Sequence, residues 1–411
     1  MERIVRGIVG SVVLATLGAL LLSGVELSEV VGRPFAGFVF RNNGDVGPRV
    51  LTSASVSPEV GRLRPQDRLV AVDGEPVAHG NVALARIAAR PVGTPVRYTF
   101  ERGGRERFDA VIPTVPFAWS DALRLFGPFL IGGFLLVALT GLVVALRPGD
   151  ERARVLFTLG AAMGTGLGVL MVDGFLGYRL GPEPQLVGLA VTKASIFHLA
   201  LLWPDRRWPL SRWPRAVPVF LYGWMLLHTA VYRIAYYDAP RLTTLLAHVT
   251  VATFTVGMML LVVNIARAAL AAPDAGLRRA SRVVLSGPAI GIVMGALLFL
   301  NTWVFTQWSI PPLLFLLPIW VTMATLGYAI VRLDLFAIDA MVRRVLVLAI
   351  QGVGAAVAYL VTLLVADRLA GGATGWTAAT LFAAALLVAI PAAAPLRRRA
   401  EAAAAQLFPR Q

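Results

Sequence analysis

Long apolar stretches alternate with short polar segments along most of the chain. Many of these stretches reach the roughly 20 residues that an α-helix needs to cross the hydrocarbon core of a bilayer. The pattern predicts a polytopic α-helical membrane protein with about ten transmembrane helices. We place the spans at about residues 8–27, 123–146, 155–177, 186–203, 217–236, 242–266, 283–306, 312–331, 345–366 and 376–395.

One long polar segment, residues 29–118, separates the first span from the second. Its short runs of apolar residues are bounded by Gly and Pro, which is typical of strands joined by turns. The strand-like runs are FAGFVF, PRVLTSASV, DRLVAVD and VRYTFER, and NVALARIAA has the pattern of a short helix. We predict a small α+β domain here, called the module below. The predicted organisation is a first transmembrane helix (1–28), the module (29–118), a nine-helix bundle (119–396) and a basic tail (397–411).

The distribution of charge predicts the topology. Charged residues are only 15% of the chain, yet its net charge is +15. Loops on the cytoplasmic side of membrane proteins are enriched in Arg and Lys. A cytoplasmic N-terminus puts twenty Arg in inner segments and four in the short outer loops. Both termini are therefore predicted to be cytoplasmic and the module extracytoplasmic. Topology and contact with anionic lipid explain the basic excess without a nucleic-acid partner.

Several predicted spans contain Gly at every fourth position. Examples are Gly160, Gly164 and Gly168, and also Gly287 and Gly291. Small residues at this spacing let helix backbones approach closely. We expect them to pack within one bundle, and the alternative is a seam between two copies in a homodimer.

The segment Glu59–Val77, EVGRLRPQDRLVAVDGEPV, resembles the consensus of bacterial PDZ domains. The matching positions are Leu63, Arg64, Pro65, Asp67, Leu69, Val72, Gly74 and Val77, with Gln66 where the family usually has Gly. Proteins of this family bind an extended peptide as an added strand beside a helix, with backbone N–H groups around its carboxylate.

The PDZ resemblance implies a peptide-binding groove in the module. Its loop would be Phe35-Ala36-Gly37-Phe38, and Val82 and Arg86 would line the helical wall. The loop departs from the common Gly-Leu-Gly-Phe form, so binding of a terminal carboxylate does not follow from it. The alternative is a PDZ-like fold that only packs against the membrane helices.

A second segment, Tyr328–Val361, resembles the last transmembrane stretch of multi-pass bacterial sensor histidine kinases. The matching positions are Asp334, Leu335, Phe336, Ile338, Asp339, Arg343, Leu346 and Val347. IFHLALLWPDRR, Ile196–Arg207, is similar to an earlier helix end in these proteins, and some members, among them quorum-sensing competence kinases, have a PDZ-like module after the first helix. The resemblance implies the membrane input region of such a kinase in the bacterial inner membrane. It also implies a cytoplasmic relay through Asp334, Asp339, Arg343 and Arg344.

The chemistry of known enzymes is not found in the sequence. A membrane zinc protease needs two His in an HExxH motif, and none of the four His is followed by Glu. There is no Cys, no phosphate-binding loop and no room for kinase domains after the last span. We therefore predict no enzyme activity, no metal and no cofactor. The tail PLRRRAEAAAAQLFPRQ is expected to dock on a separate partner, unless an output domain has been lost.

Ionisable residues inside predicted spans are candidates for function, because burying a charge in lipid is costly unless it is paired or hydrated. Lys193 and Asp173 lie at comparable depth, so we predict a buried Lys193–Asp173 pair. A structural link is expected, and a ligand or proton site is the alternative. His198 is expected to be a packing residue.

These observations favour a membrane sensor that binds a peptide or small amphipathic ligand outside the cell. It would relay the signal to a separate cytoplasmic partner such as a histidine kinase. A PDZ-based envelope scaffold without signalling is one alternative. A transporter is another, although we find no internal repeat of the kind that transporters often contain.

Overall fold

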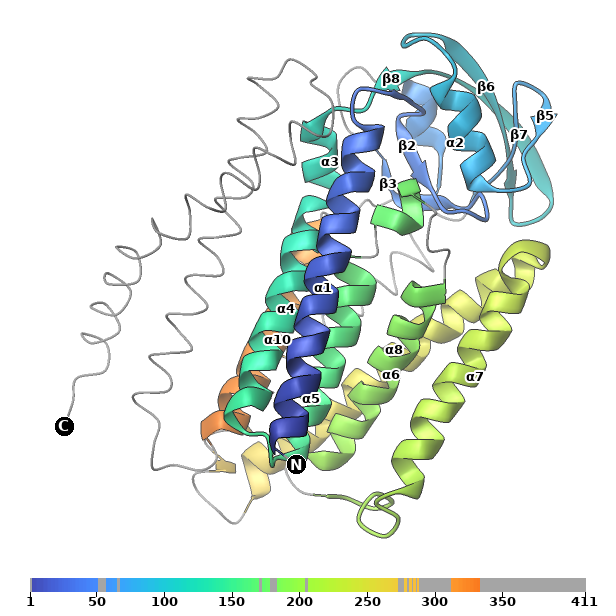
Figure 1. The fold of residues 1–411 in the computed structure, drawn as a ribbon. Helices are drawn as coiled ribbons and strands as arrows, with labels where there is room; N and C mark the ends of the chain where they lie inside the picture. Colours follow the sequence, from blue (N-terminus) through green and yellow to red (C-terminus); the bar gives the residue numbers. More distant parts are fainter. Residues whose placement is uncertain are drawn as a thin grey trace, which may run out of the picture.

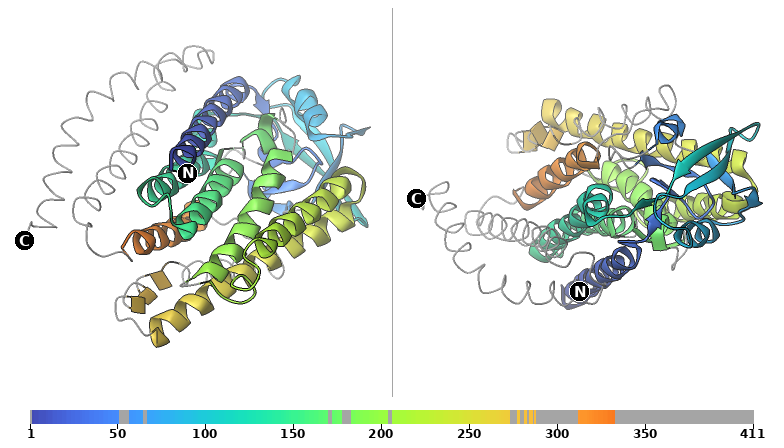
Figure 2. Two further views of the ribbon diagram at one scale, coloured as in Figure 1. Left: turned by 60° about the horizontal axis from the view of Figure 1, so that its bottom comes forward. Right: turned by 90° about the horizontal axis from the view of Figure 1, so that it is seen from above.

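The computed structural model describes residues 2–50, 57–64, 67–169, 172–177, 183–203, 206–272 and 312–332, with isolated positions between 277 and 287. Long helices form one body, and the module lies at one end of them (Figure 1). The N-terminus and the loop 206–215 lie at the opposite end. Figure 2 shows the same arrangement from two further directions.

Seven long or medium helices overlap predicted spans, and the third of them ends at Met163, well before the predicted end at residue 177. They are α1 (Glu2–Val30), α4 (Gly127–Leu146), α5 (Glu151–Met163), α6 (Glu183–Leu202), α7 (Ala216–Asp238), α8 (Pro240–Ala271) and α10 (Pro312–Arg332). A short helix α3 (Trp119–Leu125) precedes α4, and two π-helical turns follow α5, η2 (Gly164–Val169) and η3 (Asp173–Gly177).

Three helices of the described part are long and apolar enough to cross a membrane. They are Gly127–Leu146, Glu183–Leu202 and Arg241–Ala271, with mean hydropathies of 2.6, 1.5 and 2.1. The helical membrane class is thus supported by length and composition, while the number of ten spans stays a prediction. The predicted spans at 283–306, 345–366 and 376–395 and the tail lie outside the continuously described residues.

The module is an α+β domain, as predicted. Its main sheet has the strand order β5 (Glu75–Pro76), β4 (Arg68–Val72), β6 (Pro95–Arg102), β7 (Glu106–Pro113), all antiparallel. Two small sheets pair β1 (Pro34–Phe35) with β8 (Val115–Pro116) and β2 (Phe38–Phe40) with β3 (Val46–Val50). A helix α2 (Gly80–Ala88) and a 3₁₀ turn η1 (Pro58–Arg62) complete it.

The sequence explains these elements locally. Inward positions of β6, Val96, Tyr98 and Phe100, alternate with outward ones, as a strand with one buried face requires. The Asp73-Gly74 pair joins β4 to β5 with φ of 52° and 82°, the positive values that a two-residue hairpin turn needs. The strand β7 was not predicted, although its burial alternates in the same way.

The module has a hydrophobic core of its own, formed by β2, β3, η1, α2, the main sheet and the residues beside them. Its buried residues are Ala36, Phe38, Phe40, Val46, Val60, Leu63, Leu69, Val72, Ala83, Ile87, Val96, Tyr98, Phe100, Ala110 and Ile112. Because this core uses only residues of 29–118, the segment has the packing of a domain.

The predicted packing role of one glycine series is confirmed. Gly160 lies against Thr140, and Gly164 and Gly168 lie against Gly133 of α4, so close that a Cβ at any of them would clash. These glycines therefore seat α5 and η2 on α4 inside one chain. They are used within the bundle and are not exposed for a homodimer seam.

Candidate functional site

A second core joins the module to the helices. This junction core contains Phe35, Val39, Val115 and Phe117 of the module, Leu27 of α1, and Phe175 and Leu176 of η3. Further buried members come from α3, α4 and α10, namely Trp119, Ala122, Leu125, Phe126, Phe129, Leu130 and Leu316, with Val172 beside η3. The module thus packs directly against the helices of the bundle through a shared hydrophobic core.

The strand segment 35–40 divides its side chains between the two cores. Phe35 and Val39 belong to the junction core, and Ala36, Phe38 and Phe40 belong to the module core. Gly37 between them has φ of 79°, which a residue with a side chain rarely adopts. This glycine lets one short segment fill two cores.

The chain enters and leaves the module at one point. Gly32 N–H donates to the carbonyl of Phe117 at 2.8 Å, and Phe117 N–H donates to the carbonyl of Arg33 at 3.1 Å. Pro34 pairs with Pro116 and Phe35 with Val115 in the small β1–β8 sheet. Entry and exit are therefore fastened together directly above α1 and α3.

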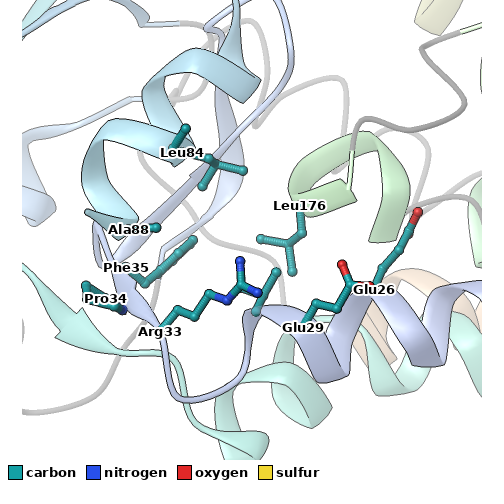
Figure 3. Close-up of a pocket in the computed structure, with 10 residues that line it drawn as sticks. Glu26, Glu29, Arg33, Pro34, Phe35, Leu84, Ala88 and Leu176 are labelled. Atoms are coloured by element: carbon teal, nitrogen blue, oxygen red, sulfur yellow. The ribbon is translucent and has the colours of Figure 1, made fainter. Parts of the chain in front are cut away.

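A cavity of about 270 Å³ lies at this point, between the end of α1, the β1 segment, α2 and η3 (Figure 3). We call it the junction cavity. Its lining residues are Glu26, Glu29, Val30, Arg33, Pro34, Phe35, Leu84, Ala85, Ala88 and Leu176. Both the module and the helical bundle contribute walls, so an occupant would touch both.

The polar lining of the junction cavity comes from one side. Glu26 is only 1% exposed, and Glu29 lies one turn further along α1. Arg33 follows on the link to β1, and in Figure 3 the ends of Glu29 and Arg33 point into the space. Two carboxylates and one guanidinium are poorly suited to a peptide carboxylate alone, because like charges repel.

The predicted groove residues are only partly brought together. Phe35, Ala36 and Phe38 are almost completely buried in the two cores. Arg86 donates to the carbonyls of Glu75 and Pro76 at 3.0 and 3.1 Å, so it lies along β5.

The α2 residues that line the junction cavity are Leu84, Ala85 and Ala88, whereas Val82 and Arg86 are not among them. The assignment of Val82 and Arg86 to the helical wall of a PDZ peptide groove is a separate expectation, and it stays a prediction. One face of α2 packs into the module core through the buried Ala83 and Ile87. The neighbouring face of the helix lines the junction cavity. Leu84 and Ala88 are four residues apart, so the sequence already indicates that they lie on the same face of α2.

The segment η3 lies against both β2 and α2. Phe175 sits so close to Gly47 that a Cβ on that glycine would lie 2.7 Å from the ring, and the Arg41 guanidinium lies 5.8 Å from the same ring centroid. Bundle side chains therefore cover a module face that the PDZ resemblance assigns to a peptide. The PDZ fold itself stays a prediction.

A polar contact joins the module to the end of α7. Asn42 donates to the Tyr237 hydroxyl at 3.2 Å, Arg68 donates to the Tyr237 carbonyl at 2.7 Å, and His79 meets the Tyr237 ring edge-on at 5.0 Å. Nearby, burial raises the pKa of Asp45, and the positive charge of Arg41 opposes that shift. The module thus has a second attachment, to a different helix from those of the junction core.

The predicted Lys193–Asp173 pair is wrong. Lys193, 2% exposed on α6, contacts His228 Nδ1 of α7 at 3.3 Å and Thr250 Oγ1 of α8 at 3.5 Å. Asp173 is buried in η3, next to the module. The turn η3, which contains Asp173, lies against α2 and β2 of the module, so equal depth in the sequence did not mean contact.

His198 lies lower on α6. Its side chain is 8% exposed, with Nε2 3.7 Å from a Glu151 carboxylate oxygen and its ring edge-on to Tyr222 at 6.0 Å. His198 is buried, as expected of a packing residue, but its two ring nitrogens make no hydrogen bond within the described part of the chain. The neighbouring carboxylate of Glu151, which also pairs with Arg206, was not foreseen. Asp334, Asp339, Arg343 and Arg344 lie outside the described residues.

Within the described ranges, no three His, Asp or Glu side chains gather as a metal ion would require, so we assign no metal site to them. No family model matches the chain, and no curated protein or solved structure matches it. The candidate site therefore rests on the geometry of this chain alone. It consists of the junction cavity and the two contacts that join the module to the bundle, which are the junction core and the polar contact at Tyr237.

Proposed function

We propose that the chain is a membrane sensor whose input site is the junction cavity. The observation that supports this most is the origin of the cavity walls: Glu26, Glu29 and Val30 come from α1 of the bundle, and Leu84 and Ala88 come from the module. A ligand with different affinity for two arrangements of these walls would shift the module against the bundle. The ligand class is a peptide or a small amphipathic molecule.

The output side is proposed from the resemblance to sensor histidine kinases. The protein would sit in the bacterial inner membrane with both termini cytoplasmic and the module outside. The loop 206–215, with its four Arg, lies at the end of the bundle away from the module, which supports this orientation. A separate partner such as a histidine kinase would receive the signal through the inner loops and the tail.

The scaffold alternative requires a groove that is open to peptides. The burial of Phe35, Ala36 and Phe38 and the position of Phe175 against the module disfavour it. Sensing is therefore the proposed function. Peptide binding by the module without a response of the helices would favour the scaffold instead.

Cross-linking across the junction cavity tests the proposal. The chain has no Cys, so Leu84→Cys with Leu176→Cys gives one defined pair for a short bis-maleimide. The control pair is Thr99→Cys with Asp109→Cys, which face each other across β6 and β7. The purified chain is studied in lipid nanodiscs by hydrogen exchange of residues 206–216.

The proposal expects the junction cross-link to change the exchange of the cytoplasmic loop 206–216, and the control cross-link to leave it unchanged. An identical exchange pattern for the cross-linked and free junction pair would contradict transmission through the bundle. In that case the module acts without the helices, as a scaffold would.

A further inference from the structure

The size of the junction cavity limits its occupant. A volume of about 270 Å³ lies near the lower end of the range for small-molecule pockets, which begins at roughly 300 Å³. It therefore fits a small molecule or the end of a larger one. A folded protein segment or a long peptide would not fit inside it.

The chemistry of the lining is divided. The charged groups, Glu26, Glu29 and Arg33, all come from the end of α1 and the link that follows it. The opposite wall is apolar and consists of Leu84 and Ala88 of α2 with Leu176 of η3. Figure 3 shows this division, with Arg33 and Glu29 facing Leu84 and Leu176 across the space.

The charged side contains both signs. Within the described part of the chain, the exposed Arg33 side chain makes no hydrogen bond or ion pair, so its five N–H donors are available to an anionic group. The carboxylates of Glu26 and Glu29 are acceptors that favour an ammonium group. A ligand of a single sign would leave one of these two partners facing a like charge.

We propose that the junction cavity binds a small amphipathic zwitterion, with its ammonium group at Glu26 and Glu29, its anionic group at Arg33, and its apolar part against Leu84, Ala88 and Leu176. This inference rests on the proposed function and names the ligand class of that site. Two sources share the chemistry: an apolar amino acid, alone or at the end of a short peptide, and the head group of an aminophospholipid.

Binding to the full chain in nanodiscs tests the proposal. Radiolabelled leucine is titrated in phosphatidylcholine nanodiscs, and a photoactivatable phosphatidylethanolamine is incorporated into separate nanodiscs. The variants Glu29→Gln and Arg33→Gln each remove one charge-assisted contact, for which we expect about a tenfold to hundredfold weaker Kd or lipid labelling. Ala88→Phe fills the cavity and is expected to abolish binding.

Two controls separate binding from folding. Val82→Phe makes the same kind of enlargement on α2 away from the cavity, and Glu106→Gln removes an exposed carboxylate of β7. Both are expected to bind like the natural chain. Hydrogen exchange of β6 confirms that each variant has a folded module.

Saturable binding of either probe that is lost in Ala88→Phe supports the inference, and the probe that binds identifies the source. No saturable signal for either probe up to about 10 mM, where affinity would be below about 3 kcal/mol, overturns it. Binding that survives Ala88→Phe also overturns it. The cross-link test of the proposed function is independent, so a failed ligand class with intact transmission leaves the sensor proposal standing.

Discussion

The guanidinium of Arg68 donates a 2.7 Å hydrogen bond to the main-chain carbonyl of Tyr237 at the end of α7. Arg68 belongs to β4 of the module, so this bond ties the main sheet of the module to a helix that does not contribute to the junction core. A cation at a helix C-terminus also interacts favourably with the helix dipole.

Arg68→Met is expected to loosen this attachment. A hydrogen bond to a charged donor contributes about 1.5–3 kcal/mol, and the partial exposure of Arg68 puts the expected loss at the lower end. Chemical unfolding of the chain in detergent measures it. Arg97→Met, an exposed position of β6 in the same sheet, is the control. Equal stabilities of the two variants would show that the bond contributes nothing.

The pair Asp67–Arg102 is predicted to stabilise the module strongly. Asp67 is 1% exposed, receives two 2.8 Å bonds from Arg102 and accepts the Arg64 N–H at 2.8 Å. Asp67→Asn leaves Arg102 without its counter-charge, which should cost about 2–3 kcal/mol.

The exposed pair Glu101–Arg107 provides the control for Asp67→Asn. Glu101→Gln should change the free energy of unfolding by less than about 0.5 kcal/mol, since exposed ion pairs contribute little. A loss at Glu101→Gln as large as that at Asp67→Asn would contradict the assignment of stability to the buried pair.

Asp45 is expected to make stability depend on pH. Its pKa is raised in the folded chain, chiefly by burial, so the folded state holds this proton more tightly than the unfolded state. The stability from that proton is present below the unfolded pKa of about 4 and is lost as the pH rises through the folded pKa.

Asp45→Asn removes this titration. Relative to Asp45→Asn, the natural chain should lose stability as the pH rises above about 4 and through the raised folded pKa of Asp45. Unfolding of both proteins by denaturant at several pH values gives the difference. Parallel pH profiles of the two proteins would exclude Asp45 as the titrating group.

The contact between Lys193 and His228 is expected to couple α6 to α7. A double-mutant cycle of Lys193→Gln and His228→Gln should give an interaction energy of about 0.5–2 kcal/mol, the range for polar contacts between membrane helices. Unfolding in mixed detergent supplies the four stabilities. Additive losses would mean that the two side chains are close but energetically independent.

The sequence predicted the local elements well, because their signals are local. The strand-like run VRYTFER predicted β6, and the run DRLVAVD predicted β4. Apolar length gave the positions of α4, α6 and α8. The π-helical turns that follow Met163 leave no such signal, so Asp173 was assigned to a span when it belongs to the junction.

The candidate site was harder to predict, because its residues are far apart in the sequence. The junction cavity joins Glu26, Arg33, Leu84 and Leu176, which only the packing of η3 on the module brings together. The partner of Lys193 depended in the same way on how α6, α7 and α8 are rotated about their axes. Periodicity indicates which face of a helix is buried, and it does not identify the residue opposite.

The module and the bundle share one junction core, and Phe175 of η3 is one of its buried residues. The ring of Phe175 is 4% exposed and packs between the two parts, so Phe175→Ala should cost about 3–5 kcal/mol. The matched control is Phe220→Ala on α7, where the ring is 67% exposed.

The measurement is hydrogen exchange of the module strands in full-length Phe175→Ala. If the core is shared, the amide protection factors of Phe38–Phe40 and Arg68–Val72 should fall by about a hundredfold or more in Phe175→Ala. Phe220→Ala should leave them unchanged. Unchanged protection of these strands in Phe175→Ala, with exchange increased only in the helices, would contradict a shared core and make the module an independent domain.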